Sequence, residues 1–301
     1  MKNTIHRPLQ LAAVLGLSLF ATSCLSDLRP NLVKEQPNSA ELEEKGRALL
    51  QQMAVAQGAE ALAAHETFEV TANLDINGMW NMINMDPLRS RKNQDIRMSY
   101  VINSFDGRIE YLNKKREGDI YGLQAWETYV QKKGETQAVF KKKKRWEWGL
   151  AAFHYMLEVP LRIQSAPIVR YGGEREFEGT TYDLVLASWG GEKPSKKYDQ
   201  YVFFINKTTH LADMVQINIR DHYMPVPGFL YGTVRYLDRT EVEPGLWMPT
   251  RLAIQMFQPK KKTKGIINVS FKDYSFDSIP VETLRPNGSL PVIGDEKPST
   301  D

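Results

Sequence analysis

The sequence contains very little cysteine: Cys24 is the only one among 301 residues. A single thiol excludes an internal disulfide and excludes the zinc motifs that need several cysteines. Long apolar runs are also absent. The apolar run near the start, residues 9–20, is shorter than the roughly 20 residues that a membrane-spanning helix needs.

Excess charge of either sign is also lacking. The sequence has 39 Lys and Arg against 36 Asp and Glu, and removing Lys2 and Arg7 from the start leaves 37 basic residues against the same 36 acidic ones. A nearly neutral chain is a poor binder of polyanions. We therefore expect no nucleic-acid partner.

Signatures of catalysis and of metal binding are missing too. The sequence has no G-x-S-x-G elbow, no P-loop and no G-x-G-x-x-G motif, and its histidines form no H-x-x-x-H pair. His210, Asp213, Asp221 and His222 gather in sequence, but the charged turns of a hairpin produce the same pattern. We predict no enzyme, no cofactor and no metal site, and an exported hydrolase is the least favoured hypothesis.

What the sequence does have begins with an export signal. Two basic residues precede the apolar run and small residues follow it, which is the pattern of a secretory signal. The stretch ATSC at residues 21–24 resembles the lipobox of bacterial lipoproteins. This resemblance implies that residues 1–23 are removed and that Cys24 carries lipid such as palmitate. The alternative is ordinary secretion, because Ala21-x-Ser23 also suits the general signal peptidase, which cuts the same bond.

The rest of the chain divides into three parts. Residues 24–38 are predicted to be the lipidated cysteine and a flexible tether, because they are polar and broken by Pro30 and Pro37. Residues 39–284 form one domain, and the overall 42% of apolar residues suffices for a single core. The polar tail, residues 285–301, is expected to be mobile.

Helical periodicity occurs in three places. A helix is predicted from Ser39 with Asn38 as its N-cap, and a short second helix follows Gly58. A third helix is predicted over residues 145–157, where Pro160 limits it. These helices are apolar on one face, so each needs a partner to cover it.

Strand-like alternation fills most of the remaining sequence. It begins at Thr67, and Asp106-Gly107 marks a hairpin between two alternating runs. After Pro167 at least six more strands are predicted, with Gly172-Gly173 as a turn. Such a long antiparallel sheet must curl or close. The predicted fold class is therefore α+β, with a strongly curved antiparallel sheet, a half β-barrel, clasped over a few helices in one domain.

Several stretches in this order carry a resemblance to a known family. They are GAEALAAHETFEV, HYMLEVPLRI, FEGTTYDLVLASW, YDQYVFFINKTTHLADMVQI, GLWMPTRLAIQMF and INVSFKDYSFDSIP. Over roughly residues 45–280 the chain resembles the LolA/LolB-like outer-membrane lipoprotein carrier superfamily, and in particular its uncharacterised lipoproteins. The resemblance implies a binding protein that holds acyl chains or other hydrophobic ligands between the sheet and the helices.

The resemblance also implies a set of pocket residues on the helix-facing side of the sheet and on the third helix. Plain core is the alternative role of each of them. The candidates are Leu74, Ile76, Met98, Ile102, Leu150, Phe153, Phe203, Ile205, Ile217 and Ile254.

Two basic runs stand out, at residues 141–145 and 260–264. Both suit solvated loops, and both could contact anionic head groups, at about 1 kcal/mol per basic residue near such a surface. Trp146, Trp148 and Tyr155 suit either helix core or an interfacial anchor.

The functional expectation combines the anchor and the fold. We expect a lipid-anchored protein of a Gram-negative cell envelope that binds a lipid, an acyl chain or a lipoprotein and acts in envelope trafficking. Leu25 follows the cysteine where enterobacteria place Asp to retain lipoproteins in the inner membrane, which favours the outer membrane, facing the periplasm. The alternative is a structural or protein-interaction lipoprotein without a ligand cavity, which would bind an envelope protein.

Overall fold

The structure is a computed structural model that describes residues 25–77, 87–88, 92–218, 220, 227–261 and 263–294. The predicted signal peptide and Cys24 lie outside these residues. So do Asp221, His222 and the end of the tail from residue 295.

The strands of the described chain form one antiparallel sheet of 13 strands, in the order β6-β5-β4-β3-β2-β1-β13-β12-β11-β10-β9-β8-β7. Two meanders make up this sheet, and β1 pairs with β13 to join them. Their bounds are β1 (Thr67–Ile76), β2 (Gln94–Val101), β3 (Gly107–Tyr111), β4 (Ile120–Gln124), β5 (Glu127–Gln131), β6 (Val139–Phe140), β7 (Ile168–Phe177), β8 (Thr180–Ser188), β9 (Gln200–Asn206), β10 (Ala212–Asn218), β11 (Gly232–Glu243), β12 (Leu246–Met256) and β13 (Ile267–Phe276).

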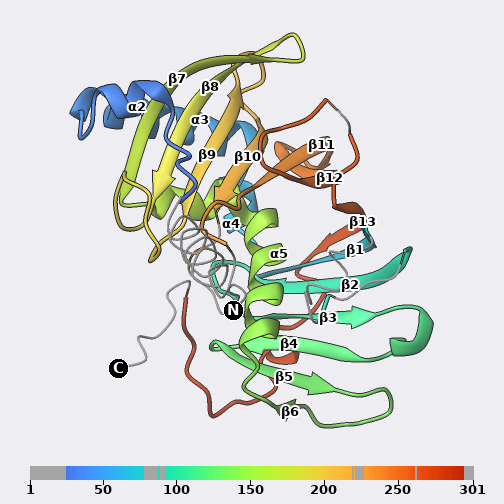
Figure 1. Cartoon of the computed structure of the whole chain (residues 1–301). Helices are drawn as coiled ribbons and strands as arrows, with labels where there is room; N and C mark the ends of the chain where they lie inside the picture. The colour runs from blue at the N-terminus through green and yellow to red at the C-terminus, as the bar shows by residue number, and fades with distance from the viewer. Residues whose placement is uncertain are drawn as a thin grey trace, which may run out of the picture.

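Helices accompany both meanders, and their bounds are α2 (Asn31–Glu35), α3 (Ala40–Gln57), α4 (Ala59–Ala63), α5 (Lys144–Arg162) and α6 (Val281–Leu284), with 3-10 turns η2 (Lys114–Arg116) and η3 (Ile163–Ser165). Helix α3 packs on β7 and β8, whereas α5 packs on β3, β4 and β5 (Figure 1). The strands turn from steep in β7–β10 to nearly level in β2–β6 in this view, as the twist of a large sheet requires. The predicted α+β class is confirmed.

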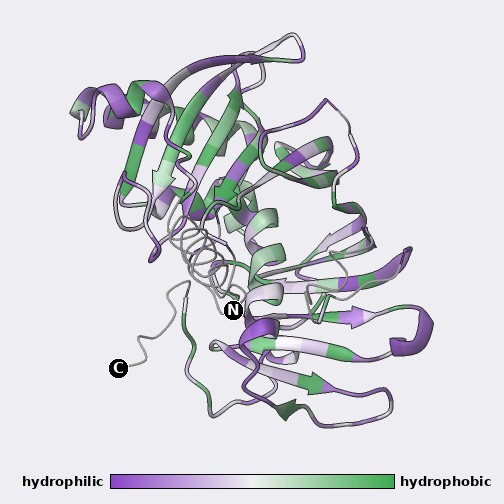
Figure 2. Ribbon diagram, viewed as in Figure 1, coloured by the Kyte–Doolittle hydropathy of each residue, from purple (hydrophilic) through white to green (hydrophobic). Residues whose placement is uncertain are grey.

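The helix-facing side of the sheet holds two apolar clusters. The first joins α5 and α4 to β1, β2, β3 and the neighbouring part of β12 and β13. The second joins α3 and the end of α5 to β7–β11. A third cluster covers the opposite face of β8, β9 and β10. Burial on both faces explains why these three strands are largely green in Figure 2.

The third cluster corrects the predicted tether. Residues 25–38 are not a free spacer, because Leu28 and Val33 are buried against Leu184, Val202 and Phe204 on the outer face of the sheet. The short helix α2 forms in this segment. Alternate residues of β8 and β9 point away from the helices and are apolar, so they need this cover.

Residues 285–294, which belong to the predicted mobile tail, make specific hydrogen bonds to the sheet and its loops. Arg285 Nε donates to the buried Asp106 carboxylate at 2.6 Å. The Asn287 backbone N–H donates to Gln124 Oε1 at 3.0 Å, and the Gln124 amide donates back to the Asn287 carbonyl at 2.7 Å. Paired polar groups of this kind hold a proline-rich segment that has no regular structure of its own.

Local details of the prediction need three corrections. Ser39, not Asn38, caps α3, because its hydroxyl accepts the Leu42 backbone N–H at 3.3 Å. Pro160 lies inside α5 and does not end it. Gly172-Gly173 is not a turn: β7 continues through it with a shift of register, and Gly173 has a φ of +88° that suits glycine in a bulge.

Candidate functional site

The ten candidate pocket residues all lie between the helices and the sheet, but in two groups. Leu74, Ile76, Met98, Ile102, Leu150 and Phe153 belong to the first cluster, and Phe203 and Ile205 belong to the second. These eight side chains are at most 6% exposed. In this structure they pack as core, so contact with a ligand would require the two layers to separate.

Ile217 and Ile254 differ from the other eight, because both are only half-buried. Ile254 packs against both clusters, and Ile217 packs against the second. Ile254 pairs with Ile267 near the end of β12, and the half-buried Ile266 precedes that partner. We call the boundary between the two clusters the seam, and Ile217, Ile254 and Ile266 the seam mouth.

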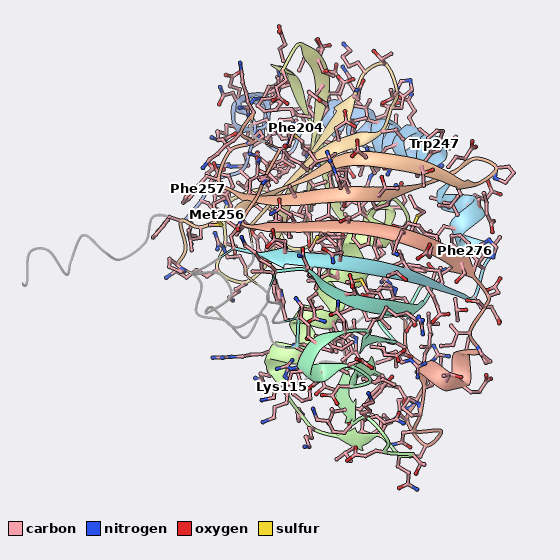
Figure 3. All side chains as sticks on the ribbon, turned by 90° about the vertical axis from the view of Figure 1, so that its right-hand side faces the viewer. Lys115, Phe204, Trp247, Met256, Phe257 and Phe276 are labelled. Carbon is pink, nitrogen blue, oxygen red and sulfur yellow. The ribbon has the colours of Figure 1, made fainter. Side chains whose placement is uncertain are left out.

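The seam mouth lies at one end of the strands. Figure 3 shows Met256 and Phe257 at this end of β12, and Trp247 and Phe276 at the other end of the sheet. Each helix is held to a different part of the sheet. At Gly46 of α3, an added Cβ would lie 2.9 Å from the Tyr171 backbone nitrogen. Helix α3 is therefore tied closely to β7, and it meets the C-terminal part of α5 within the second cluster.

A buried charged network ties α5 to the other part. His154 Nε2 lies 2.7 Å from Glu158 Oε1, and Arg162 Nη2 lies 2.7 Å from Glu158 Oε2. The Arg162 guanidinium also donates to the Ser104 carbonyl at 2.6 Å. All three side chains are essentially inaccessible to solvent. Such a network fixes the position of α5 because none of its charges can be left alone in an apolar layer.

Aromatic rings enclose this network. Tyr100 stacks on His154 with ring centroids 4.0 Å apart, and the Arg162 guanidinium lies 4.1 Å from the Phe105 ring centroid. Burial raises the pKa of Tyr100 well above its usual value, and the negative charge of Glu158 acts in the same direction. The sequence analysis missed this network. Its signal is the spacing of His154, Glu158 and Arg162, which places them on one face of a helix.

A second ionic cluster lies at the far end of the sheet from the seam mouth. His65 Nδ1 lies 2.7 Å from Asp277 Oδ2, and Nε2 lies 3.0 Å from Glu243 Oε2. The hydrogen bond that the His65 ring donates to the Asp277 carboxylate raises the pKa of His65 above its ordinary value. This cluster joins the start of β1 to the ends of β11 and β13, which is a structural role.

The basic run at residues 141–145 is exposed, and it divides between a loop and the first turn of α5, which begins at Lys144. Of the three aromatic candidates, Trp146 packs edge-on against Tyr121 at 5.0 Å, and Tyr155 contacts Tyr201 at 5.6 Å. These contacts favour packing over an interfacial anchor.

A surface hollow of about 430 Å³ lies beside α3, lined by Arg47, Ala48, Leu50, Gln51 and Gln164. Its polar lining does not suit an acyl chain. His210, Asp213, Asp221 and His222 gather in the sequence, and of these Asp213 is engaged elsewhere. Its carboxylate accepts hydrogen bonds from the Asn206 amide at 3.0 Å and from the Arg239 guanidinium at 3.3 Å. Within the described residues, no group of three or more His, Cys, Asp or Glu side chains could hold a metal ion.

None of the helices in the described part of the chain is both long enough and apolar enough to cross a membrane.

One long antiparallel sheet with the two long helices, α3 and α5, on the same apolar face is a LolA-like fold. The comparison with solved structures confirms this resemblance. A LolA superfamily protein of Nitrosomonas europaea matches with a TM-score of 0.50 at 9% identity, over 79% of this chain and 96% of that one. The two chains thus share a fold at very low identity.

Two further structures match over similar lengths. A DUF1329 family protein of Desulfovibrio piger has a TM-score of 0.49 at 10% identity, over 81% of this chain and 97% of that one. A Vibrio parahaemolyticus domain assigned to outer membrane lipoprotein sorting has a TM-score of 0.48 at 10% identity, over 80% and 97%. No protein-family model and no curated protein matches the chain.

Proposed function

We propose that this protein is a lipid-anchored lipoprotein of the bacterial envelope that binds one hydrophobic chain, of a lipid or of an acylated protein, along the seam. The observation that carries the proposal is the position of Ile254. This side chain touches both apolar clusters and is still half-buried at the end of the strands. An apolar ligand could enter there and continue between surfaces that are already apolar.

The two helices are held in a way that supports such an opening. Helix α3 is close-packed on β7 through Gly46, and α5 is bound to the segment after β2 through Arg162 and Ser104. The proposed half-barrel sheet would flex between these two regions. Each ligand methylene buried in the seam would contribute about 0.8 kcal/mol of favourable binding free energy, so a chain of about ten methylenes would offset the loss of several core contacts.

The proposed anchor is an acyl group on Cys24, and the proposed site of action is the periplasmic side of the outer membrane. A tethered binder cannot carry cargo across the periplasm by itself. It would receive or hold an acylated ligand at its own membrane, and no step of this function requires catalysis. A structural lipoprotein with a filled seam and a protein partner is the alternative.

The test compares lipid content in two variants. The full-length lipoprotein is purified gently from membranes and measured by native mass spectrometry, followed by organic extraction. Wild type is expected to carry about one non-covalent lipid per chain. Ile254→Trp fills the seam mouth and should remove that lipid, whereas Val55→Trp, at a site 71% exposed on α3, should keep it. Wild type without lipid, or equal lipid in both variants, would refute the seam as the binding site.

A further inference from the structure

The segment that follows the proposed anchor is fastened to the sheet. The Ser26 backbone N–H donates to the Gly228 carbonyl at 2.8 Å, and the Ser26 hydroxyl accepts from Arg220 at 2.7 Å. The Arg220 guanidinium also donates to the Gly228 carbonyl at 2.5 Å. Leu28 is buried two residues later. The chain therefore has no free spacer after residue 25.

This attachment limits where the lipid can lie. Cys24 is two residues before Ser26, so at about 3.8 Å per residue its Cα is within about 8 Å of the Ser26 Cα. The anchor must leave the molecule beside Gly228. A long flexible tether would allow the domain any orientation on the membrane, whereas this short connection allows few.

The surface next to Gly228 is apolar and exposed. Phe229 follows it directly and is 53% exposed, and Phe257 is 38% exposed. The rings of Tyr231 and Phe257 meet edge to face with centroids 5.5 Å apart. Tyr231 is three residues after Gly228, within about 11 Å along the chain. We call Phe229, Tyr231 and Phe257 the rim patch.

Basic charge accompanies the rim patch. Lys260, Lys261 and Lys264 follow Phe257 and are exposed. The carboxylate of Glu178, which reaches the same region, lies 2.6 Å from Arg235, and Arg235 in turn donates to the Lys260 carbonyl at 2.6 Å. Aromatic side chains bordered by lysines match the interface of a bilayer that contains anionic lipids.

We propose that the rim patch rests in the head-group layer of an anionic phospholipid bilayer, which fixes the orientation of the domain on its membrane. This proposal rests on the proposed anchor at Cys24. Phe229 and Phe257 enter the interface, and the lysines contact lipid phosphates. Trp247 and Phe276, at the opposite end of the strands, then point away from the bilayer (Figure 3), and so does the cluster of His65, whose ring stacks on Phe276.

The orientation has a consequence for the seam. Ile217 pairs with Gly232, the residue after Tyr231, and Ile254 is three residues before Phe257. The seam mouth therefore lies at the same end of the sheet as the rim patch. Because Tyr231 packs against the third cluster, on the face of the sheet away from the helices, an acyl chain from the bilayer would enter the seam around the ends of the strands, and each methylene exposed to water on the way would cost about 0.8 kcal/mol.

The experiment places a probe at each end of the sheet. Full-length Phe229→Cys and Trp247→Cys proteins are labelled with a thiol-reactive NBD dye and reconstituted into vesicles of phosphatidylethanolamine and phosphatidylglycerol. Some vesicles carry nitroxide-labelled phospholipid, which quenches NBD near the head groups. Quenching about three-fold stronger at position 229 than at position 247 is expected, since interfacial side chains lie at head-group depth. Equal quenching at the two positions would overturn the proposal.

The same proteins separate failure of the orientation from failure of the anchor. An acylated Cys24 has no free thiol, so wild type should take up no dye and each variant should take up one per chain. One dye per chain with equal quenching would refute the orientation alone. Dye on wild type would refute the anchor, and the orientation with it. Thermal unfolding of both variants, compared with wild type, confirms that the labelled domains are folded.

Discussion

Replacing Glu158 by Gln should strongly destabilise the domain. The substitution keeps the shape of the side chain and removes its charge. Glu158 is the shared partner of His154 and Arg162, at 2.7 Å from each. Without the carboxylate, the Arg162 guanidinium keeps only backbone and ring contacts in a layer that excludes water.

The expected magnitude follows from this burial. Removing one partner of a buried ion pair costs about 3–5 kcal/mol, because the other charge stays desolvated. For a domain of this size each kcal/mol lowers Tm by about 2–4 °C, so Tm should fall by roughly 6–20 °C. Thermal and urea unfolding followed by circular dichroism measures the change.

Two further variants make this test specific. Glu117→Gln makes the same chemical change in an exposed pair with Lys133 and should cost less than about 1 kcal/mol. Adding Arg162→Met to Glu158→Gln removes the isolated charge and should recover part of the lost stability. If Glu158→Gln were as mild as Glu117→Gln, the network would not hold α5 in place.

Three other changes test separate contacts. Asp277 raises the pKa of His65, so the stability that protonated His65 contributes is complete below about pH 6.5 and is lost as pH rises through the pKa of His65 in the folded state. In wild type, the free energy of unfolding should therefore fall by under about 1 kcal/mol over this range, and His65→Gln should abolish the fall. Tm measured against pH tests this, and the same profile in wild type and variant would contradict it. Gly46→Leu should lower the free energy of unfolding by about 1–3 kcal/mol through overpacking, whereas Gly288→Ala should leave it unchanged, because an added Cβ there has no neighbour within 4 Å. Equal urea midpoints for these two variants would refute the overpacking at Gly46. Asp106→Asn should speed hydrogen exchange in residues 285–294, and unchanged exchange would show that the tail is held otherwise.

Much of the fold could be predicted because its signals are local. The alternation from Thr67 to Ile76 specifies β1, and Asp106-Gly107 indicates the hairpin of β2 and β3, in which the chain turns over residues 102–105 and Gly107 begins β3. The helix that begins after Ser39 follows from its apolar periodicity, although Ser39 and not the predicted Asn38 caps it, and it ends at Gly58, whose φ of +79° suits glycine.

The predictions that failed depended on contacts far along the chain. Residues 25–38 are polar and proline-containing, and only the apolar outer face of β8 and β9 explains why Leu28 and Val33 are buried. The tail is held by Asp106, which is 179 positions from Arg285. Pro160 was expected to end a helix, yet it sits in the last turn of α5, where the burial of Val159 and Arg162 outweighs its cost.

For the candidate pocket, the sequence could predict only which face of the sheet each residue lies on. Alternation identifies which side chains point toward the helices, and it does not tell whether they meet a ligand or one another. The distinction between eight packed residues and the half-buried Ile217 and Ile254 depends on where α3 and α5 lie. That arrangement is set by Gly46 and by the charged network of α5, neither of which alternation reveals.

Native mass spectrometry of the gently purified full-length protein, followed by organic extraction, tests the central claim most directly. The account predicts an acyl modification on Cys24 together with about one non-covalent lipid per chain, lost in Ile254→Trp and kept in Val55→Trp. An acylated protein that carries no lipid in any preparation would contradict the account and would favour a structural or partner-binding lipoprotein.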